Sequence, residues 1–271
     1  MCRRVVQVSD PLRLAIVDGL SVPDSGEKNW RPRYNGAPGQ DLLVIRLNHE
    51  TGERTLEPLR WGLIPSWKKD AKGGRKLINC MSEKVTTRRS FRDAYQKRRC
   101  ILPVDGFFEW KVIKGEKKQP YAIAMKNNLP FGIAGVWETW KHPESGEPIA
   151  TFAILTIEAN ELVGRIHPRM PLILNPADYE RWLGPEPDPR DLLVKFGAYQ
   201  MKMWPVSTKV NNLRNDEPAI LDETLRRKSD DDARSAGIFR RTDIRLRHRP
   251  ERRLTFGGWL VKAVMSLTRR S

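Results

Sequence analysis

Short apolar or alternating segments, separated by turn residues, dominate residues 40–175 of this 271-residue chain. Such alternation between turn residues is typical of β-strands. The strands that we expect are residues 42–47, 100–104, 106–113, 121–125, 131–137 and 151–157. Other segments show helical spacing of their apolar positions, and Pro176 suits the first turn of one of them. The helices that we expect are residues 90–98, 159–166 and 176–183.

These elements predict an α+β fold with a curled, mainly antiparallel, barrel-like β-sheet core and short flanking helices. We expect one domain over residues 1–225 and a basic tail over residues 226–271. Within the tail, residues 256–265 have the pattern of a short amphipathic helix. The chain has no repeated βαβ pattern and no GxGxxG or Walker loop, so we expect no nucleotide cofactor. The sequence indicates no other cofactor.

Charge indicates the kind of partner. The chain carries 49 Lys and Arg against 33 Asp and Glu, a formal net charge of +16. The tail holds +9 of this surplus, which leaves +7 for residues 1–225. The main body is therefore basic in its own right, and this favours a polyanion, most commonly nucleic acid, as the partner. For the tail alone we favour a solvated charge run that forms no site.

The cysteines and the apolar runs indicate the compartment. Cys2, Cys80 and Cys100 are too few and too scattered for a disulfide framework or a zinc site. No apolar run approaches the roughly 18 residues that cross a bilayer, and the polar, basic start does not predict a signal peptide. We therefore expect a reducing compartment, the cytoplasm, with nucleoid association if the protein is bacterial. We also expect a monomer without a bound metal.

Cys2 directly follows the initiator Met1. If Met1 is removed, Cys2 carries a free α-amine and a thiol on adjacent carbons, and this pair can condense with an aldehyde to form a thiazolidine ring. The α-amine titrates near pH ~8, so it can act as a nucleophile near neutral pH. Position alone favours another interpretation, in which Cys2 is an ordinary residue of a loose terminus.

Glu109 is a candidate for proton transfer, because it stands between Phe108 and Trp110 on an expected strand. Partial loss of solvent favours protonation of a carboxylate, and this suits a general acid or base near neutral pH. The alternative is an exposed strand face on which Glu109 pairs with Lys111 or Arg99. Strands alternate their faces, so both interpretations stay open.

His167 and Asn79 are two further polar candidates. His167 lies in a segment whose prolines restrict its backbone, and histidine is the natural proton shuttle near pH 7. A hydrogen-bonded loop histidine without a catalytic role is the alternative. Asn79 follows an apolar pair and can either orient a substrate through its amide or cap the segment behind it.

Two loops have the composition of ligand contacts. The turn Tyr34–Gly39 is rich in small residues and allows close approach of a ligand, although a plain connector looks the same. Trp67 is followed by Lys68 and a second lysine. An aromatic residue with flanking cations is a common way to hold single-stranded nucleic acid, through base stacking and phosphate pairing. The alternative is that Trp61 belongs to the core and that the lysines that follow it in the sequence form a solvated loop.

Each of these signals is weak alone, but their order along the chain is specific. The segments are Met1-Cys2, Tyr34-Asn35-x-Ala37-Pro38-Gly39, Trp61-Gly62-Leu63-Ile64-Pro65, Asn79-x-x-Ser82-Glu83, Gly106-Phe107-Phe108-Glu109-Trp110, His167-x-Arg169-Met170-Pro171 and Trp204-Pro205-Val206-Ser207. In this order they resemble the SRAP family, the abasic-site processing proteins of the SOS-response-associated peptidase group. The resemblance covers residues 2–218 and leaves the tail outside.

The resemblance implies a DNA-damage function. Members of the family recognise abasic sites in single-stranded DNA, and the ring-opened abasic sugar is an aldehyde. The N-terminal cysteine forms a Schiff base with this aldehyde and closes a stable thiazolidine crosslink, which shields the lesion from strand breakage. An enzyme with autopeptidase activity toward Met1 and lyase-like crosslinking activity is therefore the implied function.

The same resemblance implies roles for individual residues. Cys2 matches the nucleophile, Glu109 the acid/base that also assists release of Met1, His167 the proton donor that opens the sugar, and Asn79 the residue that positions the lesion. The DNA contacts that we expect are Arg4, Asn35, Pro38, Trp67, Lys68 and Arg169.

The chain departs from the family pattern at two positions that matter for binding. Arg3 replaces a glycine beside the nucleophile, and a cation there should favour the thiolate. Met81 stands where the family usually has an arginine suited to a phosphate, so we expect a weaker and slightly less salt-dependent interaction with DNA. Lys84, or Arg88 and Arg89, can substitute for the missing cation.

Two other functions remain as alternatives. One is an N-terminal-nucleophile cysteine amidohydrolase that uses Cys2 on a small amide. The other is a non-catalytic single-stranded-DNA-binding protein in which Arg3 and Met81 mark a decayed site. The lysine loop and the net charge favour a DNA site over a small-molecule site.

Overall fold

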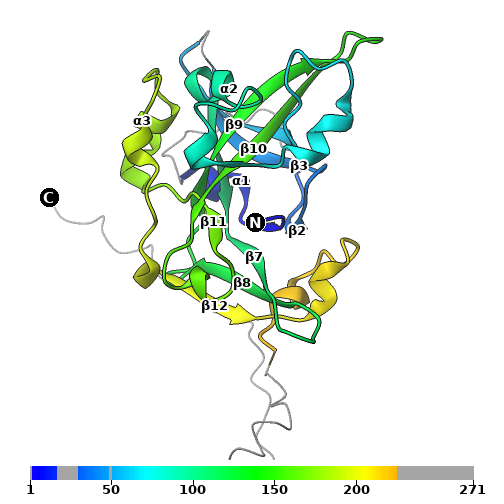
Figure 1. Cartoon of the computed structure of the whole chain (residues 1–271), viewed down its shortest axis with the longest axis vertical. Helices are drawn as coiled ribbons and strands as arrows, with labels where there is room; N and C mark the ends of the chain where they lie inside the picture. The colour runs from blue at the N-terminus through cyan, green and yellow to red at the C-terminus, as the bar shows by residue number, and fades with distance from the viewer. Residues whose placement is uncertain (1, 17–29, 49–50, 225–271) are drawn as a thin grey trace, which may run out of the picture. The chain divides into compact units, whose positions relative to one another are not determined.

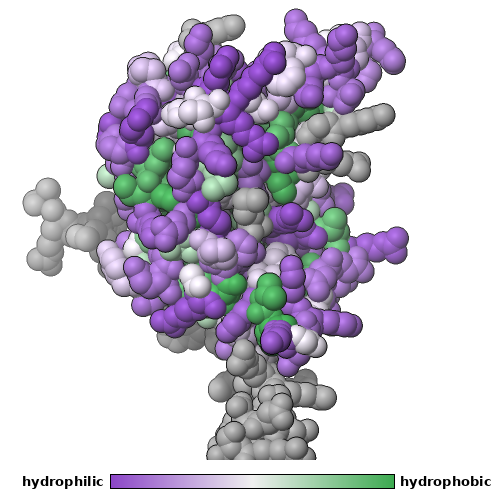
Figure 2. All heavy atoms as spheres, in the orientation of Figure 1, coloured by the Kyte–Doolittle hydropathy of each residue, from purple (hydrophilic) through white to green (hydrophobic). Residues whose placement is uncertain are grey.

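The computed structural model describes residues 2–16, 30–48 and 51–224, which belong to one compact unit, Met1–Arg226 (Figure 1). The expected tail and its amphipathic segment, residues 256–265, lie outside the described residues. The architecture is α+β, with two mainly antiparallel sheets and short helices, as the sequence predicts. Most of the described surface on the face drawn in Figure 2 is hydrophilic, with small separate apolar patches.

Five strands close into a barrel. They are β3 (Asp41–Leu47), β4 (Arg54–Trp61), β6 (Arg99–Val104), β9 (Phe131–Lys141) and β10 (Pro148–Glu158). The order is β10-β4-β3-β6-β9, and the pairing of β9 with β10 closes the ring. All of these pairs are antiparallel except β10 with β4, which is parallel. Trp61 and Phe152 stack in the buried core with ring centroids 6.1 Å apart.

The far end of β10 carries two short strands that hold the site. β5 (Asn79–Met81) pairs in parallel and β11 (Arg169–Pro171) pairs antiparallel with β10. Thr156 is the partner of Met81 in one pairing and of Pro171 in the other. Since a strand has two edges, β5 and β11 lie on opposite sides of β10 at this point.

The second sheet has the order β12-β8-β7-β1-β2, all antiparallel. Its strands are β1 (Val5–Gln7), β2 (Arg33–Gly36), β7 (Gly106–Lys111), β8 (Gln119–Met125) and β12 (Met201–Pro205). One face joins the barrel core, and the other forms a small core with residues of η7 (Thr208–Asn211) and η8 (Pro218–Leu221). Gln7 ties β1 to the barrel, because its buried amide donates to the carbonyls of Leu43 and Pro103.

The helices are short. The α-helices are α1 (Pro11–Ile16), α2 (Arg92–Lys97) and α3 (Tyr179–Leu183), and the remaining 3₁₀ turns are η1 (Ala71–Lys76), η2 (Ser82–Lys84), η3 (Val163–Arg165), η4 (Pro176–Asp178), η5 (Arg190–Leu192) and η6 (Ala198–Gln200). Pro176 lies in the first turn of η4, as expected. The helix expected over residues 159–166 is wrong, because only η3 forms there. The side-chain oxygen of Asn160 accepts from the backbone of Leu162 and Val163, and this bond favours a tight turn.

Candidate functional site

Cys2 is fixed at the junction of the two sheets. Its side chain has no exposed surface and belongs to the main core together with Val5 and Phe107. The Asn79 amide nitrogen donates to the Cys2 carbonyl at 2.8 Å, and the Cys2 Sγ donates to the Arg4 carbonyl at 3.5 Å. The interpretation of a loose terminus is therefore wrong, and Asn79 acts on the chain backbone at Cys2.

Glu109 lies on β7, beside the start of the chain. β1 and β7 pair with Val5 opposite Phe107, and the Phe108 backbone donates to the Arg4 carbonyl. Side chains alternate along a strand, so Phe107 and Glu109 face the barrel, whereas Phe108 and Trp110 pack in the small core on the other face. Glu109 is only 3% exposed, so the exposed-face interpretation is wrong.

The surroundings of Glu109 differ from the expected ones in two ways. The aromatic residues next to it in the sequence point away, so its burial comes from the packing of β7 against the barrel. Arg99 is not its ion partner, because the Arg99 guanidinium donates to five backbone carbonyls near α2 and α3. The charge of Glu109 acts instead on the Cys2 thiol.

The Cys2 thiol rests in its protonated form at neutral pH. Burial raises the pKa of the Cys2 thiol far above its usual range, and the Glu109 carboxylate raises this pKa further. The hydrogen bond to the Arg4 carbonyl and the charge of Arg4 oppose this shift but do not overcome it. Arg3 is exposed and does not favour the thiolate as expected, because desolvation dominates. The thiol therefore needs a base when it reacts.

His167 follows η3 and is half-buried. Its backbone nitrogen donates to the Val163 carbonyl at 3.0 Å. Its Nδ1 lies 3.0 Å from the Arg169 backbone nitrogen and 2.9 Å from the Arg169 carbonyl oxygen. A neutral ring with its proton on Nε2 accepts from the Arg169 N–H, and a protonated ring donates to the Arg169 carbonyl. The backbone at Arg169 thus accommodates both protonation states of the His167 ring.

Arg169 joins the two segments that flank β10. Its guanidinium forms a forked ion pair with Glu83, at 2.7 and 3.0 Å, and also donates to the Thr156 carbonyl at 2.5 Å. The hydrogen bond from Arg169 holds the pKa of the Glu83 carboxyl below its usual range. A phosphate that approaches this guanidinium must share it with Glu83. The DNA contact expected of Arg169 stays a prediction.

The arrangement matches a known family. The family described as SOS response associated peptidase (SRAP) matches residues 1–213. The chain belongs to the SRAP family. One relative, the "Abasic site processing protein YoqW" of Bacillus subtilis, is 40% identical over 200 residues, which are 72% of this chain and 88% of the relative. The "Abasic site processing protein HMCES" of Gallus gallus is 34% identical over 226 residues, which are 72% of this chain and 67% of that protein.

Solved structures support the same assignment of the fold. A crystal structure of a Bacteroides thetaiotaomicron protein superposes with a TM-score of 0.74 at 27% identity, over 83% of this chain and 100% of that chain. A Bordetella bronchiseptica protein superposes with a TM-score of 0.63 at 26% identity, over 76% of this chain and 100% of that chain. The fold of this SRAP chain is therefore shared with solved proteins of two bacteria.

Two of the expected DNA contacts in this SRAP chain are already engaged within the protein. The Asn35 amide is buried and donates to the carbonyls of Val210, Asn212 and Asn215, so it fixes the segment after β12. Its burial does not favour the direct DNA contact, which stays a prediction. Pro38 is half-buried in a turn that is held by the Gly39 N–H, which donates to the Trp61 carbonyl at 2.7 Å.

Of the other expected contacts, Arg4 is half-buried like Pro38, whereas Trp67 and Lys68 are exposed. Burial lowers the pKa of Arg4, and its Nε has no hydrogen-bond partner among the described residues. The Lys68 Nζ lies 5.0 Å from the Trp67 ring centroid. The Arg89 guanidinium lies 4.4 Å from the same centroid, a position that the sequence does not predict. The basic run at Arg88 and Arg89 was the only available signal.

The described residues form neither a metal-binding cluster nor a membrane-spanning helix. No group of His, Cys, Asp and Glu in this part of the chain has an arrangement that could hold a metal ion. No described helix is both long enough and apolar enough to cross a bilayer. The three thiols are free and buried.

The buried thiols predict a loss of stability in alkali. Burial raises the pKa of Cys100 above its usual range and that of Cys80 to about 12, whereas unfolded thiols titrate near ~8.5. Between these values the unfolded state loses the proton and the folded state keeps it. Each such thiol therefore lowers the free energy of unfolding by about 1.4 kcal/mol per pH unit in this window.

Urea unfolding between pH 9 and pH 11 measures this effect. The variant Cys100→Ala should show a shallower fall of the unfolding free energy than the parent protein, by the contribution of one thiol. Equal slopes for the two proteins would show that the Cys100 thiol is not protected from ionisation.

Proposed function

We propose that this protein senses abasic sites in single-stranded DNA and forms a thiazolidine crosslink to them through Cys2, after autocatalytic removal of Met1. The crosslink protects the lesion during the response to DNA damage. The observation that carries the proposal is the fixed position of Cys2, whose carbonyl accepts from Asn79 and whose thiol lies within the field of Glu109. The relatives named abasic site processing proteins support it.

Removal of Met1 comes first in this mechanism. Water adds to the Met1–Cys2 peptide carbonyl and the bond breaks, which gives free methionine and the Cys2 α-amine. Glu109 is buried and close enough for its charge to act on the Cys2 thiol, so it is the carboxylate that we expect to accept a proton from the water and return it to the leaving amine. The Asn79 contact keeps the Cys2 backbone in place during this step.

Crosslinking follows in two stages. The Cys2 amine adds to the sugar aldehyde, and loss of one water molecule gives an imine. The thiol sulfur then adds to the imine carbon, and this new bond closes the ring. The thiol proton ends on the nitrogen. Because the thiol rests protonated, Glu109 is the group that takes its proton and passes it on. His167 donates the proton that opens the sugar ring, and Arg169 accommodates the imidazole in both states.

A denaturing gel tests the proposal directly. The purified protein is incubated with single-stranded DNA that carries an abasic site, and with the same strand undamaged. We expect a heat-stable shifted band with the abasic strand only, and intact-mass analysis should show that Met1 is absent. Lack of a covalent band, with equal affinity for both strands, would instead favour the non-catalytic DNA-binding protein.

Substitution of Glu109 tests the proton transfer. Glu109→Gln keeps the shape of the side chain and removes its charge, so we expect slower Met1 removal or slower crosslinking, about 10²-fold for a lost general acid/base. The rates come from a time series of intact masses and of gel bands. The control is Glu116→Gln, which makes the same substitution on the exposed hairpin between β7 and β8. Unchanged rates for both reactions in Glu109→Gln would refute its role.

A further inference from the structure

The barrel has a gap in its hydrogen bonding between β3 and β6. These strands pair antiparallel with Ile45 opposite Ile101, and two residues further on the same register would place Leu43 opposite Pro103. Proline has no N–H, so Pro103 cannot donate to the Leu43 carbonyl, and the pairing of the two strands does not extend this far. The backbone groups of Leu43 therefore need another partner.

The side chain of Gln7 fills this gap. Its Nε2 donates to the Leu43 carbonyl at 2.9 Å and to the Pro103 carbonyl at 2.8 Å, and its Oε1 accepts from the Leu43 N–H at 2.9 Å. The side chain is 1% exposed, so no water competes for these bonds. A primary amide can make all three because it carries two donors and an acceptor. The contact therefore depends on which residue occupies position 7.

β1 needs such a contact because the strand is short. It comprises three residues and pairs with β7 and with β2 at two positions each, with an irregular register toward β2. Packing distinguishes one register from the next poorly, because Val5 and Val6 carry the same side chain. A shift by one residue would nevertheless turn every side chain of the strand to the other face.

The other contacts at the start of the chain do not select a register either. The Asn79 amide donates to the Cys2 carbonyl. The Phe108 N–H donates to the Arg4 carbonyl. Both bonds end on a backbone carbonyl, and a neighbouring residue could supply the same group after a shift. Gln7 is different, because its side chain enters the barrel and its amide has no equivalent at the adjacent positions.

We propose that Gln7 is a positioning residue, which fixes the register of β1 and thereby places the amine and the thiol of Cys2 for reaction. This proposal rests on the proposed function, because it names what holds the reacting groups of the same site. A displacement of about 1 Å in reacting groups can slow a reaction about 10²-fold. Loss of the Gln7 amide should therefore slow crosslinking in protein that is still folded.

Gln7→Met tests the proposal, because it keeps the length of the side chain and removes the amide. The rate constant of crosslinking is measured on denaturing gels at saturating abasic single-stranded DNA, under conditions in which urea unfolding shows that the variant is folded. We expect a rate constant about 10²-fold lower than that of the parent protein. The Kd for the undamaged strand, from fluorescence anisotropy, should not change. A role in folding alone would lower the final amount of crosslink and leave the rate constant unchanged.

Arg99→Met is the matched control for stability. It also removes buried donors from backbone carbonyls, but these carbonyls lie near α2 and α3 and not beside β1. We expect this variant to be less stable than the parent protein and to crosslink with the same rate constant.

Gln7→Glu is the conservative variant, and it decides the matter if Gln7→Met does not fold. The introduced carboxyl can donate to a carbonyl only while it is protonated, and burial beside two carbonyls favours the protonated form. The rate constant relative to that of the parent protein should therefore rise as the pH falls from about 8 to about 5.5. A ratio that stays constant over this range would contradict the proposal.

Labelling by iodoacetamide reports the position of Cys2 without DNA. Peptide mass mapping gives the labelling rates of Cys2 and Cys100, which are both buried in the parent protein. In Gln7→Met we expect Cys2 to be labelled faster than Cys100, because only the start of the chain is displaced. Arg99→Met should not raise the labelling of Cys2 above that of Cys100.

Two outcomes overturn the role of Gln7. One is an unchanged rate constant for Gln7→Met, and the other is an equal slowing in Arg99→Met, which would trace the effect to lost stability. If the parent protein forms no crosslink, the proposed function fails by itself. The labelling of Cys2 in Gln7→Met then decides whether Gln7 fixes the register of β1.

Discussion

Replacement of Cys2 by alanine should abolish the covalent band with abasic single-stranded DNA while it leaves reversible binding intact. The thiol is the atom that closes the thiazolidine ring, and no second thiol is placed to replace it, since Cys80 and Cys100 are buried in the barrel. We expect reversible binding to depend on exposed surface groups and on the net charge, which Cys2→Ala does not change. The gel measures the covalent product, and anisotropy measures the binding.

The variant Cys2→Ser separates the amine from the thiol. It keeps the α-amine and the size of the side chain, so the imine should still form. Borohydride reduces an imine to a stable amine, so we expect a covalent band for Cys2→Ser only when borohydride is present. Intact-mass analysis first confirms that Met1 is absent, because a retained Met1 blocks the amine.

Cys100→Ala is the matched control for this experiment, because it removes a buried thiol from β6 without a change at the start of the chain. It should crosslink like the parent protein. A heat-stable band for Cys2→Ala without any reductant would refute the thiazolidine mechanism.

The sequence is enough to propose the chemistry of Cys2, because this chemistry depends on two groups of one residue. The contact that positions Cys2 could not be predicted. Asn79 reaches it through β5, which pairs in parallel with a strand more than seventy residues away in the chain. The same non-local pairing brings Glu83 to Arg169 across Thr156. Local patterns predict strands, but they do not predict which strands meet.

The surroundings of Glu109 could likewise be predicted only in part from the sequence. Alternation along β7 predicts that Phe108 and Trp110 share one face and that Phe107 and Glu109 share the other. The sequence does not say which face meets the barrel, because both faces of the sheet are covered by apolar residues. Burial of Glu109 is one of the two interpretations that the sequence leaves open, and the reason given for it is wrong, since its aromatic neighbours lie on the opposite face.

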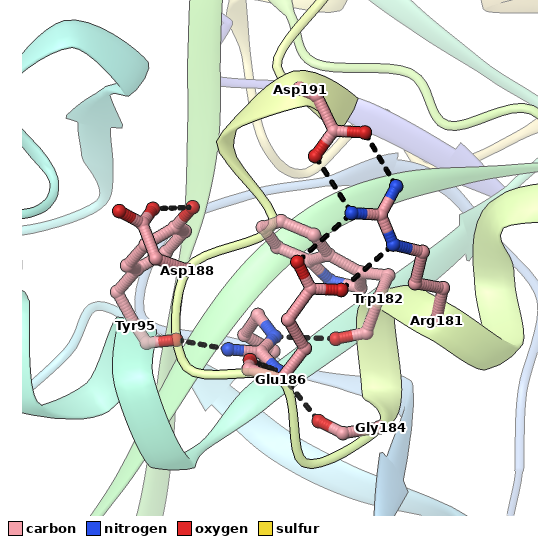
Figure 3. Close-up of polar contacts among 8 residues, drawn as sticks. Tyr95, Arg181, Trp182, Gly184, Glu186, Asp188 and Asp191 are labelled. Atoms are coloured by element: carbon pink, nitrogen blue, oxygen red, sulfur yellow. Dashed lines mark hydrogen bonds and ion pairs between the residues drawn. The ribbon is translucent and has the colours of Figure 1, made fainter.

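Replacement of Arg99 should cause a large loss of stability. Arg99 is 4% exposed, and burial lowers the pKa of its guanidinium. The carbonyls that accept from it belong to Tyr95, Gln96, Trp182, Gly184 and Glu186, at distances from 2.5 to 3.4 Å. Several of these groups converge in Figure 3. Those of Tyr95 and Gln96 lie in the last turn of α2, those of Trp182 and Gly184 at the end of α3, where carbonyls lack partners inside the helix, and that of Glu186 in the segment after α3.

The variant Arg99→Met keeps much of the volume and removes every donor. The carbonyls at both helix ends are then left without their partner in a buried place, and a buried unsatisfied polar group costs about 1–3 kcal/mol. Water can reach some of these groups after a small rearrangement. We therefore expect the free energy of unfolding to fall by about 3 kcal/mol or more, measured by urea unfolding near pH 7.

Arg181→Met is the matched control, because Arg181 makes nearly as many hydrogen bonds in a different setting. Figure 3 shows its guanidinium between the carboxylates of Glu186 and Asp191. Its side chain is 44% exposed, so water replaces the lost partners and the change in stability should be small. If the two variants lost equal stability, the number of hydrogen bonds would matter here and their burial would not. A large loss confined to Arg99→Met would show that this buried arginine holds α2 and α3 on the barrel.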